Sequence, residues 1–214
     1  MDPSVKQALA KWPDVPAVYG WLSLDERGRW RIHEQGDAHL GDPGDLIANP
    51  QILAFINRNY GSDAQGRWYF QNGPQRVYVR LDAAPYILRQ ADTGTGLITH
   101  TTLPVRTISG WWLDRTGRLY ARTDAGAGMI EDRDLGAVLG QLKVAPGGAC
   151  LVDVIEPLTA TGSSDAGLKL AYPGYAGSAP LASGIDRAAI GGLMGFVAHP
   201  RADQQAAQTG PDCR

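Results

Sequence analysis

Three short segments of this sequence share the motif D-x-x-G-R, and this repeat constrains the fold more than any other feature. They are residues 25–30 (DERGRW), 63–68 (DAQGRW) and 114–119 (DRTGRL). The leading Asp can accept hydrogen bonds from backbone N–H groups further along the loop, and Gly at the fourth position tolerates a positive φ. Alternating apolar residues flank the motif. The repeat therefore predicts three β-hairpins, each closed by a type I turn with a glycine bulge.

Helix-capping residues mark the helices expected between these hairpins. Asn49 is a good N-cap, Pro50 suits the first helical position, and Gly61 suits the position after the helix. A later helix has Asp132 or Asp134 as its cap, with Leu and Val residues repeating at helical spacing. The predicted helices cover residues 3–12, 49–61 and 132–142.

The remaining apolar stretches are short and separated by turn residues, as in β-strands. Strands are expected at 68–70, 76–81, 85–89, 97–102 and 111–122, with further candidates at 150–156, 167–172 and 193–198. Strands and helices do not alternate regularly, so a parallel doubly wound sheet is disfavoured. The predicted fold class is α+β, with antiparallel β-hairpins and a few short helices.

Composition divides the chain into unequal parts. Fourteen of the 17 aromatic residues precede position 121, whereas 34 of the last 69 residues are Gly, Ala, Ser or Pro. Large aromatic side chains dominate core burial, so the first part has the more readable core. We expect a hairpin-and-helix domain, a Gly/Ala-rich annex that packs on it, and a mobile tail, at residues 1–145, 146–199 and 200–214 respectively.

One predicted strand carries a set of side chains that could bind an anion. Arg76, Tyr78 and Arg80 share one strand face, while Val77 and Val79 occupy the other. Arginine can pair bidentately with carboxylates or phosphates. A solvated sheet face with arginine stems over aromatic rings is the simpler interpretation. The binding hypothesis places a small anionic ligand, or an acidic loop of a protein partner, on a polar strip of Asn72, Gln75, Arg76, Tyr78 and Arg80.

The familiar catalytic motifs are missing from the sequence. There is no G-x-S-x-G, no G-x-x-x-x-G-K-[ST] and no H-E-x-x-H. Segment 33–39 (HEQGDAH) could hold a divalent metal through His33, Glu34, Asp37 and His39, but no third His or Cys follows at a fixed spacing. An exposed hairpin extension is the simpler interpretation, so we predict neither a metal site nor a cofactor. Cys150 is expected to be buried and inert.

Charge and hydropathy limit the classes of partner. The formal net charge is −2, which is too little positive field to favour nucleic acid. No apolar stretch approaches the roughly 20 residues that a membrane helix needs. No secretory leader is visible at the N-terminus. We therefore expect a cytoplasmic protein that binds neither nucleic acid nor membrane.

Two segments resemble a known family. Residues 58–89 (RNYGSDAQGRWYFQNGPQRVYVRLDAAPYILR), together with residues 16–30 (PAVYGWLSLDERGRW), are similar to a proteobacterial family catalogued as a domain of unknown function. The resemblance covers roughly residues 1–140, with a weaker similarity at 195–200 (GFVAHP). The arrangement also resembles a second uncharacterised bacterial family, which implies two related β-rich units. Neither resemblance implies an activity or a catalytic residue.

Two functions of different classes therefore remain. The first is a non-enzymatic binding or interaction module that uses a polar sheet face. The second is an enzyme, such as a hydrolase, whose site is assembled from dispersed residues. A pocket with perturbed carboxylates or histidines would favour the enzyme.

Overall fold

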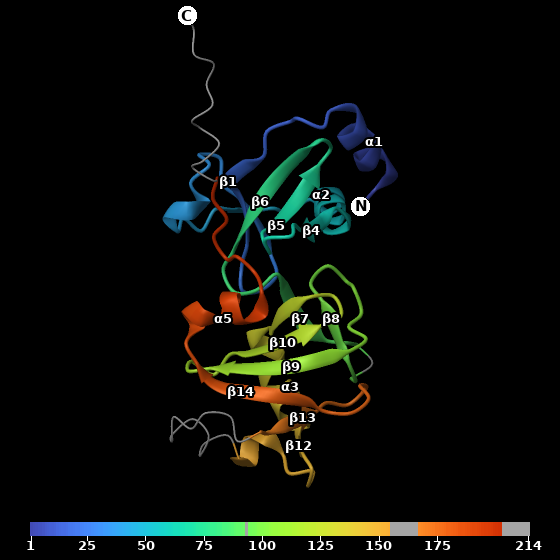
Figure 1. Ribbon diagram of the computed structural model, residues 1–214, viewed down its shortest axis with the longest axis vertical. Helices are drawn as coiled ribbons and strands as arrows, with labels where there is room; N and C mark the ends of the chain where they lie inside the picture. Colours follow the sequence, from blue (N-terminus) through green and yellow to red (C-terminus); the bar gives the residue numbers. More distant parts are fainter. Residues whose placement is uncertain (93, 155–166, 203–214) are drawn as a thin grey trace, which may run out of the picture.

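The chain folds around two mixed β-sheets. The computed structural model describes residues 1–92, 94–154 and 167–202. The first sheet has the strand order β3-β2-β1-β6-β5-β4, and the second has the order β12-β13-β14-β9-β10-β11-β7-β8. Figure 1 shows the two sheets in two units that follow one another along the long axis of the molecule. This arrangement confirms the α+β class and the two β-rich units.

The first unit contains the N-terminal helices and the first six strands. Its elements are α1 (Pro3–Lys11), β1 (Val18–Leu24), β2 (Trp30–Ile32), the 3-10 helix η1 (Ala38–Leu40), β3 (Asp45–Leu46), α2 (Pro50–Arg58), β4 (Tyr60–Ser62), β5 (Trp68–Asn72) and β6 (Gln75–Leu81). The central strands β1 and β6 run parallel to each other. Hairpins form the rest of the sheet.

The second unit holds the remaining strands. Its elements are β7 (Tyr86–Gln90), β8 (Leu97–Thr99), β9 (Ile108–Asp114), β10 (Leu119–Thr123), β11 (Ala127–Ile130), α3 (Asp132–Gln141), β12 (Lys143–Ala145), β13 (Lys169–Ala171), β14 (Ala179–Ile185) and α5 (Arg187–Met194). Strand β11 pairs in parallel with β7, and β14 with β9. The sequence predicted antiparallel hairpins, and these long-range parallel pairs differ from that prediction.

The D-x-x-G-R motif forms a hairpin turn at each of its three positions. In the first, Asp25 N donates to Arg29 O at 3.1 Å, and Gly28 N donates to Asp25 O at 3.0 Å. The Asp25 carboxylate accepts from the backbone N–H groups of Arg27 at 3.0 Å and Arg29 at 2.9 Å. The same bonds recur in the turns that begin at Asp63 and Asp114. The local turn chemistry is therefore as predicted.

The predicted helices are present, with differences at their ends. Asn49 caps α2 through its side chain, but the helix ends at Arg58 and Gly61 lies in β4. Pairing of β4 with β5 takes these residues out of the helix. Helix α3 has Glu131 as its N-cap, without a side-chain bond, in place of Asp132 or Asp134. The Asp134 carboxylate accepts instead from Gln90 N at 2.7 Å.

The Gly/Ala-rich part differs most from the sequence predictions. Residues 151–154 are helical rather than extended. The predicted strand over 193–198 is wrong, because α5 continues to Met194 and only Val197 makes a bridge, to Arg67. Strand β14 occupies a stretch for which no strand was predicted. It forms because β9 supplies a pairing edge, a long-range contact that the local sequence does not reveal. Residues 155–156 and the predicted tail beyond 202 lie outside the described residues.

One continuous hydrophobic core joins the two units. It includes Leu24 and Val79 of the first sheet, Trp111 and Leu119 of the second, and Phe196 after α5. Residues 169–171 and 179–185 belong to the second sheet, and they contribute Leu170 and Leu181 to this core. Within the described residues, no helix combines the length and the apolar character needed to cross a bilayer.

Candidate functional site

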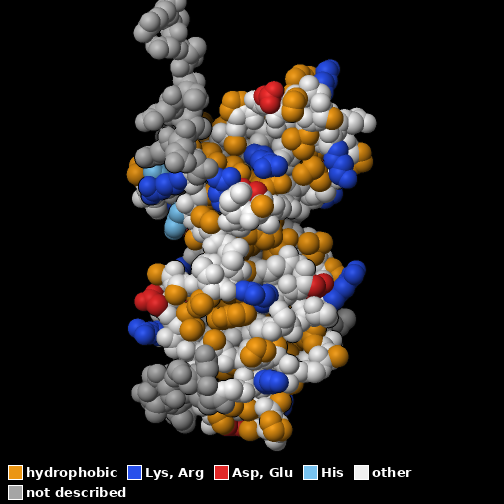
Figure 2. Space-filling view, in the orientation of Figure 1, with side chains coloured by type: hydrophobic (Ala, Val, Ile, Leu, Met, Phe, Trp, Pro, Cys, Tyr) orange, Lys and Arg blue, Asp and Glu red, His pale blue; other side chains and the backbone are white. Residues whose placement is uncertain are grey.

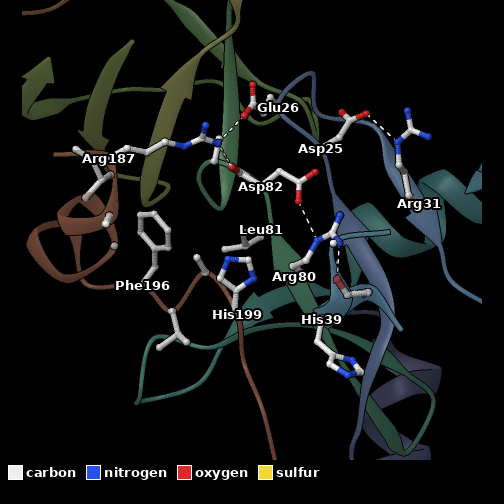
Figure 3. A pocket seen from close by; sticks show the side chains of 18 of the residues that line it. Asp25, Glu26, Arg31, His39, Arg80, Leu81, Asp82, Arg187, Phe196 and His199 are labelled. Carbon is white, nitrogen blue, oxygen red and sulfur yellow. Dashed lines mark hydrogen bonds and ion pairs between the residues drawn. The ribbon is translucent and has the colours of Figure 1, made fainter. Parts of the chain in front are cut away.

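A cleft of about 1240 Å³ lies where the two units meet. Four parts of the chain line it: the β1–β2 turn, the loop after β2, the end of β6, and α5 with the segment that follows. Figure 3 shows side chains from these parts pointing toward one another, and Figure 2 shows basic and histidine side chains gathered at the junction of the units. Ligand sites commonly lie at such junctions.

Arginine is the most frequent charged residue of the cleft. Five arginines and four carboxylates line it. The apolar part of the wall includes Leu81, Ile190, Phe196 and Val197. The cleft is therefore amphipathic, with a slight excess of positive charge. The arginines are Arg27, Arg29, Arg31, Arg80 and Arg187, and the carboxylates are Asp25, Glu26, Asp82 and Asp186.

Asp25 holds two of these arginines in place. Its Oδ2 accepts from Arg29 Nε at 2.8 Å and from Arg31 Nε at 3.0 Å. Burial raises the pKa of Asp25, but the hydrogen bonds from Arg29, Arg31 and Arg27 outweigh it, so the pKa is lowered from its usual value. Both arginines are bound through Nε. Arg29 makes no hydrogen bond with its terminal nitrogens among the described residues, so these donors remain available.

A second ion-pair network ties α5 to the first hairpin. Arg187 donates to Glu26 and to the backbone oxygen of Asp82, as Figure 3 shows. Arg118, in the turn before β10, also reaches Glu26, at 2.7 Å. Glu26 therefore joins three segments that are distant in the sequence. These pairs fix the position of α5 on the wall of the cleft.

Arg80 is the member of the predicted polar strip that lines the cleft. Its side chain is buried, and its Nε donates to Asp82 Oδ1 at 2.9 Å. Its Nη1 donates to the backbone oxygens of Ala38 and Asp42, the latter at 3.0 Å. Arg80 thus anchors the loop after β2. The expectation of an open sheet face is wrong at this position, because that loop covers β6.

The other strip residues lie away from the cleft and make contacts within the protein. Tyr78 is buried, stacks on Tyr19 with ring centroids 4.6 Å apart, and donates to Asp63 at 2.9 Å. Arg76 lies over the Tyr69 ring at 4.5 Å. Gln75 donates to Pro16 O at 3.3 Å, and Asn72 is exposed beside the turn between β5 and β6. The structure does not bring Tyr78 and Arg80 to an exposed strip.

Most of the residues that line the cleft could not be assigned to a site from the sequence. The arginines of the first turn were interpreted only as turn residues, although Arg29 and Arg31 alternate with Trp30 and must share a strand face. That alternation was the available signal. His199 and α5 had no comparable signal, because they approach the first unit only through the tertiary fold.

The structure separates the four residues of segment 33–39 that were considered as metal ligands and set aside. His33 and Asp37 lie together, joined by Asp42 in place of Glu34 and His39. His39 lines the cleft instead. Cys150, expected to be buried, is partly exposed, and Lys143 Nζ donates to its Sγ at 2.7 Å.

The family model DUF2944, described as "Protein of unknown function (DUF2946)", matches residues 1–201. The chain belongs to this family. The match confirms a family of unknown function and extends past the resemblance seen over residues 1–140. No curated protein sequence matches the chain.

Two crystal structures of DUF1285 family proteins are similar to it. One, from Shewanella baltica OS155, has 12% identity and a TM-score of 0.37, and covers 54% of this chain and 87% of its own. The other, from Silicibacter pomeroyi DSS-3, has 14% identity and a TM-score of 0.26, and covers 83% of this chain and 69% of its own.

Proposed function

We propose that this member of the DUF2944 family is a binding protein, whose ligand combines an anionic group with an apolar part and occupies the cleft between the two units. One observation carries the proposal. Arg29 lines the cleft, is held by Asp25 through Nε, and keeps its terminal nitrogens free of hydrogen bonds among the described residues. A guanidinium fixed in this way is pre-organised for a carboxylate or phosphate.

The electrostatics of the cleft favour binding over acid catalysis. The lowered pKa of Asp25 keeps this carboxylate ionised near neutral pH, so it does not donate a proton there. Its role is to orient Arg29 and Arg31. The apolar wall that includes Leu81 and Phe196 would contact the uncharged part of the ligand.

A thermal-shift measurement tests the proposal with defined probes. Inorganic phosphate and citrate supply an anion alone, whereas phenyl phosphate and benzoate add an apolar ring. We expect phenyl phosphate or benzoate to raise Tm more than the simple anions. Arg29→Gln should weaken the binding about tenfold or more, since a hydrogen bond to a charged group contributes about 1.5–3 kcal/mol.

Arg76→Gln is the matched control, because it removes an arginine from the polar strip and leaves the cleft intact. It should bind the probes like the wild type. Loss of binding in Arg76→Gln with retention in Arg29→Gln would place the anion on the strip of Asn72, Gln75, Arg76, Tyr78 and Arg80 and overturn the cleft proposal. The absence of any shift with all four probes would also overturn it.

A hydrolytic enzyme that uses the same cleft is the second candidate. It is favoured by His39 and His199, two imidazoles that line the cleft (Figure 3). An enzyme should hydrolyse p-nitrophenyl acetate or p-nitrophenyl phosphate and lose this activity in His39→Ala or His199→Ala. A binding protein should show no turnover above the buffer rate.

We also propose three further properties of this protein: a proteobacterial origin, GRWYFQNGPQRVYV as the family signature, and a cytoplasmic location. The resemblance over residues 58–89 supports the first two.

A further inference from the structure

The loop between β2 and β3 gathers one imidazole and two carboxylates. His33 Nδ1 lies 3.5 Å from Asp42 Oδ2 and 3.9 Å from Asp37 Oδ1. The three potential ligand atoms all lie within 4.8 Å of one another. His33 is only 1% exposed, whereas the Asp37 and Asp42 side chains are 30% and 49% exposed. The group is therefore closed on the protein side and accessible from solvent on the other.

His33 is oriented toward the two carboxylates by its second ring nitrogen. Its Nε2 lies 2.8 Å from Ser23 Oγ, and Ser23 is fully buried in β1. Nδ1 is buried and has no hydrogen-bond partner among the described residues. A buried polar atom without a partner is costly, and a cation between Nδ1 and the carboxylates would satisfy it. In that arrangement Nε2–H donates to Ser23 Oγ, and Nδ1 offers its lone pair to the cation.

The backbone of the loop maintains this arrangement. Gly44 has a φ of +66°, and a Cβ added there would lie 2.7 Å from His33 Cε1. Gly44 N also donates to Asp42 Oδ2 at 2.9 Å. Glycine at this position therefore lets the chain pass beside the imidazole while its N–H holds the carboxylate.

We propose that His33, Asp37 and Asp42 bind a divalent transition-metal ion of the zinc type. Ligand atoms at about 2.0–2.1 Å from a tetrahedral Zn²⁺ are about 3.3 Å apart, close to the two separations from Nδ1. Imidazole with carboxylates suits zinc, whereas Mg²⁺ and Ca²⁺ prefer oxygen ligands alone. The hydroxyl on Nε2 is the kind of outer contact that orients a metal-binding histidine. Three protein ligands leave one position open toward solvent.

Arg80 connects this group of ligands to the cleft. Arg80 bonds to the Asp42 backbone and also lines the cleft, so the site adjoins the cleft without including its other arginines.

Calorimetric titration of the chelator-treated full chain with ZnCl₂ tests the site. We expect one Zn²⁺ per chain and a rise in Tm, with no rise from MgCl₂ at the same concentration. The Asp37→Asn/Asp42→Asn variant should bind Zn²⁺ about tenfold or more weakly, because both anionic ligands are lost. Its Tm without metal should stay close to that of the wild type, since both side chains are partly exposed. Asp45→Asn, at an exposed position in the adjoining strand, is the matched control and should bind like the wild type.

A ring-nitrogen NMR measurement identifies the histidine that is involved. Zn²⁺ should shift the Nδ1 resonance of His33, and the exposed His39 should serve as an internal reference. The proposal is wrong if Zn²⁺ does not bind, if the double variant binds it equally, or if His39 or His199 shifts in place of His33. The Arg29→Gln variant should retain zinc binding, so failure of the cleft proposal and failure of the zinc proposal are distinguishable.

Discussion

The first and second D-x-x-G-R turns have the same backbone hydrogen bonds but different surroundings. The turn at Asp63 is covered by the segment after α5, where Val197 N donates to Gly66 O at 2.9 Å. The turn at Asp25 opens on the cleft, with Arg29 in its wall. The local motif thus forms a reliable hairpin, and its tertiary surroundings decide whether its arginine is enclosed or offered to a ligand.

The third turn shows a further outcome of the same motif. Its arginine, Arg118, does not pair with the Asp of its own turn but with Glu26 of the first hairpin, at 2.7 Å. Asp114 is instead buried, at 1% exposure, and its carboxylate accepts from the backbone N–H groups of Thr116 and Arg118 and from the Thr116 hydroxyl. One sequence motif therefore serves three structural roles.

The largest expected effect is on the free energy of unfolding, and it should be greater for Asp114 in the third turn than for Asp25 in the first. Asp114→Ala would leave several buried donors without an acceptor, and we expect a loss of about 4 kcal/mol in the free energy of unfolding. Asp25→Ala should cost about 2 kcal/mol, because Arg29 can turn to solvent. Urea unfolding of both variants measures the difference. Equal losses would contradict the distinction between the two turns.

Replacing the glycine of each turn by Ala should destabilise the protein to a degree that depends on what surrounds that turn. All three have a positive φ, so each substitution should cost about 1 kcal/mol from backbone strain. At Gly66 the new Cβ would lie 2.5 Å from Gly195 O, and at Gly28 it would lie 2.6 Å from His100 Cβ. At Gly117 the new Cβ would have no such neighbour within 4 Å. We expect losses of about 3 kcal/mol at Gly66, slightly less at Gly28 and about 1 kcal/mol at Gly117.

Thermal unfolding of the three glycine variants measures this order. Gly117→Ala is the internal control, because only the strain of the turn contributes there. A Gly117→Ala variant as unstable as Gly66→Ala would show that the turn itself, rather than its surroundings, sets the cost.

Acid should weaken the packing beneath the first turn. His100 lies against Gly28 and the Trp30, Tyr60 and Tyr86 rings, and burial with the charge of Arg89 lowers its pKa to about 3, opposed by Asp25. The unfolded chain takes up a proton near pH 6.5 and the folded chain does not. This contribution is therefore complete above pH 6.5 and falls toward pH 3, by about 2 kcal/mol at pH 5.

Urea unfolding from pH 7 to pH 4 tests this dependence. In His100→Gln, the slope of the free energy of unfolding against pH should decrease by up to about 1.4 kcal/mol per pH unit. His33, whose pKa is also lowered, contributes in the same direction in both proteins and so cancels from the comparison. An unchanged slope would mean that His100 is protonated equally in both states.

The smallest expected effect concerns the ion pair that links the third turn to the first. The Arg118 and Glu26 side chains are partly exposed, so their coupling should be about 0.5–1 kcal/mol, decreasing with added salt. A double-mutant cycle with Arg118→Gln and Glu26→Gln measures it. Arg187 shares Glu26 and remains in every member of the cycle. A coupling above about 2 kcal/mol would mean that the pair is screened far less than its exposure implies.

Local patterns predicted the hairpins and most helices well, because their hydrogen bonds join residues that are close in the chain. The Asn49 cap and the three glycine turns are examples. The prediction was poor at β14 and α5, where the chain lacks strong periodicity. Gly191 illustrates the reason: a Cβ there would lie 2.9 Å from Phe196 O, so a residue that disfavours helix is required by packing.

The candidate sites were predictable only in fragments. Arg80, His33 and Asp37 were identified from the sequence, but with different neighbours from those that the structure brings to them. Asp42 joined His33 and Asp37 through the fold of their shared loop, and α5 joined the cleft through contacts that span a long stretch of chain. Spacing in the sequence does not report such contacts.

The sequence by itself determined the turns, the Asn49 helix cap and the aromatic core of this protein, because each depends on bonds or burial patterns within a few residues. Only the tertiary structure decided which arginines face the cleft and which carboxylates meet His33. The first outcome depends on the parallel pairing of β1 with β6 and of β9 with β14, and the second on the fold of the loop between β2 and β3. Strand pairing over such separations is stabilised by the packed core as a whole, so no local segment encodes it.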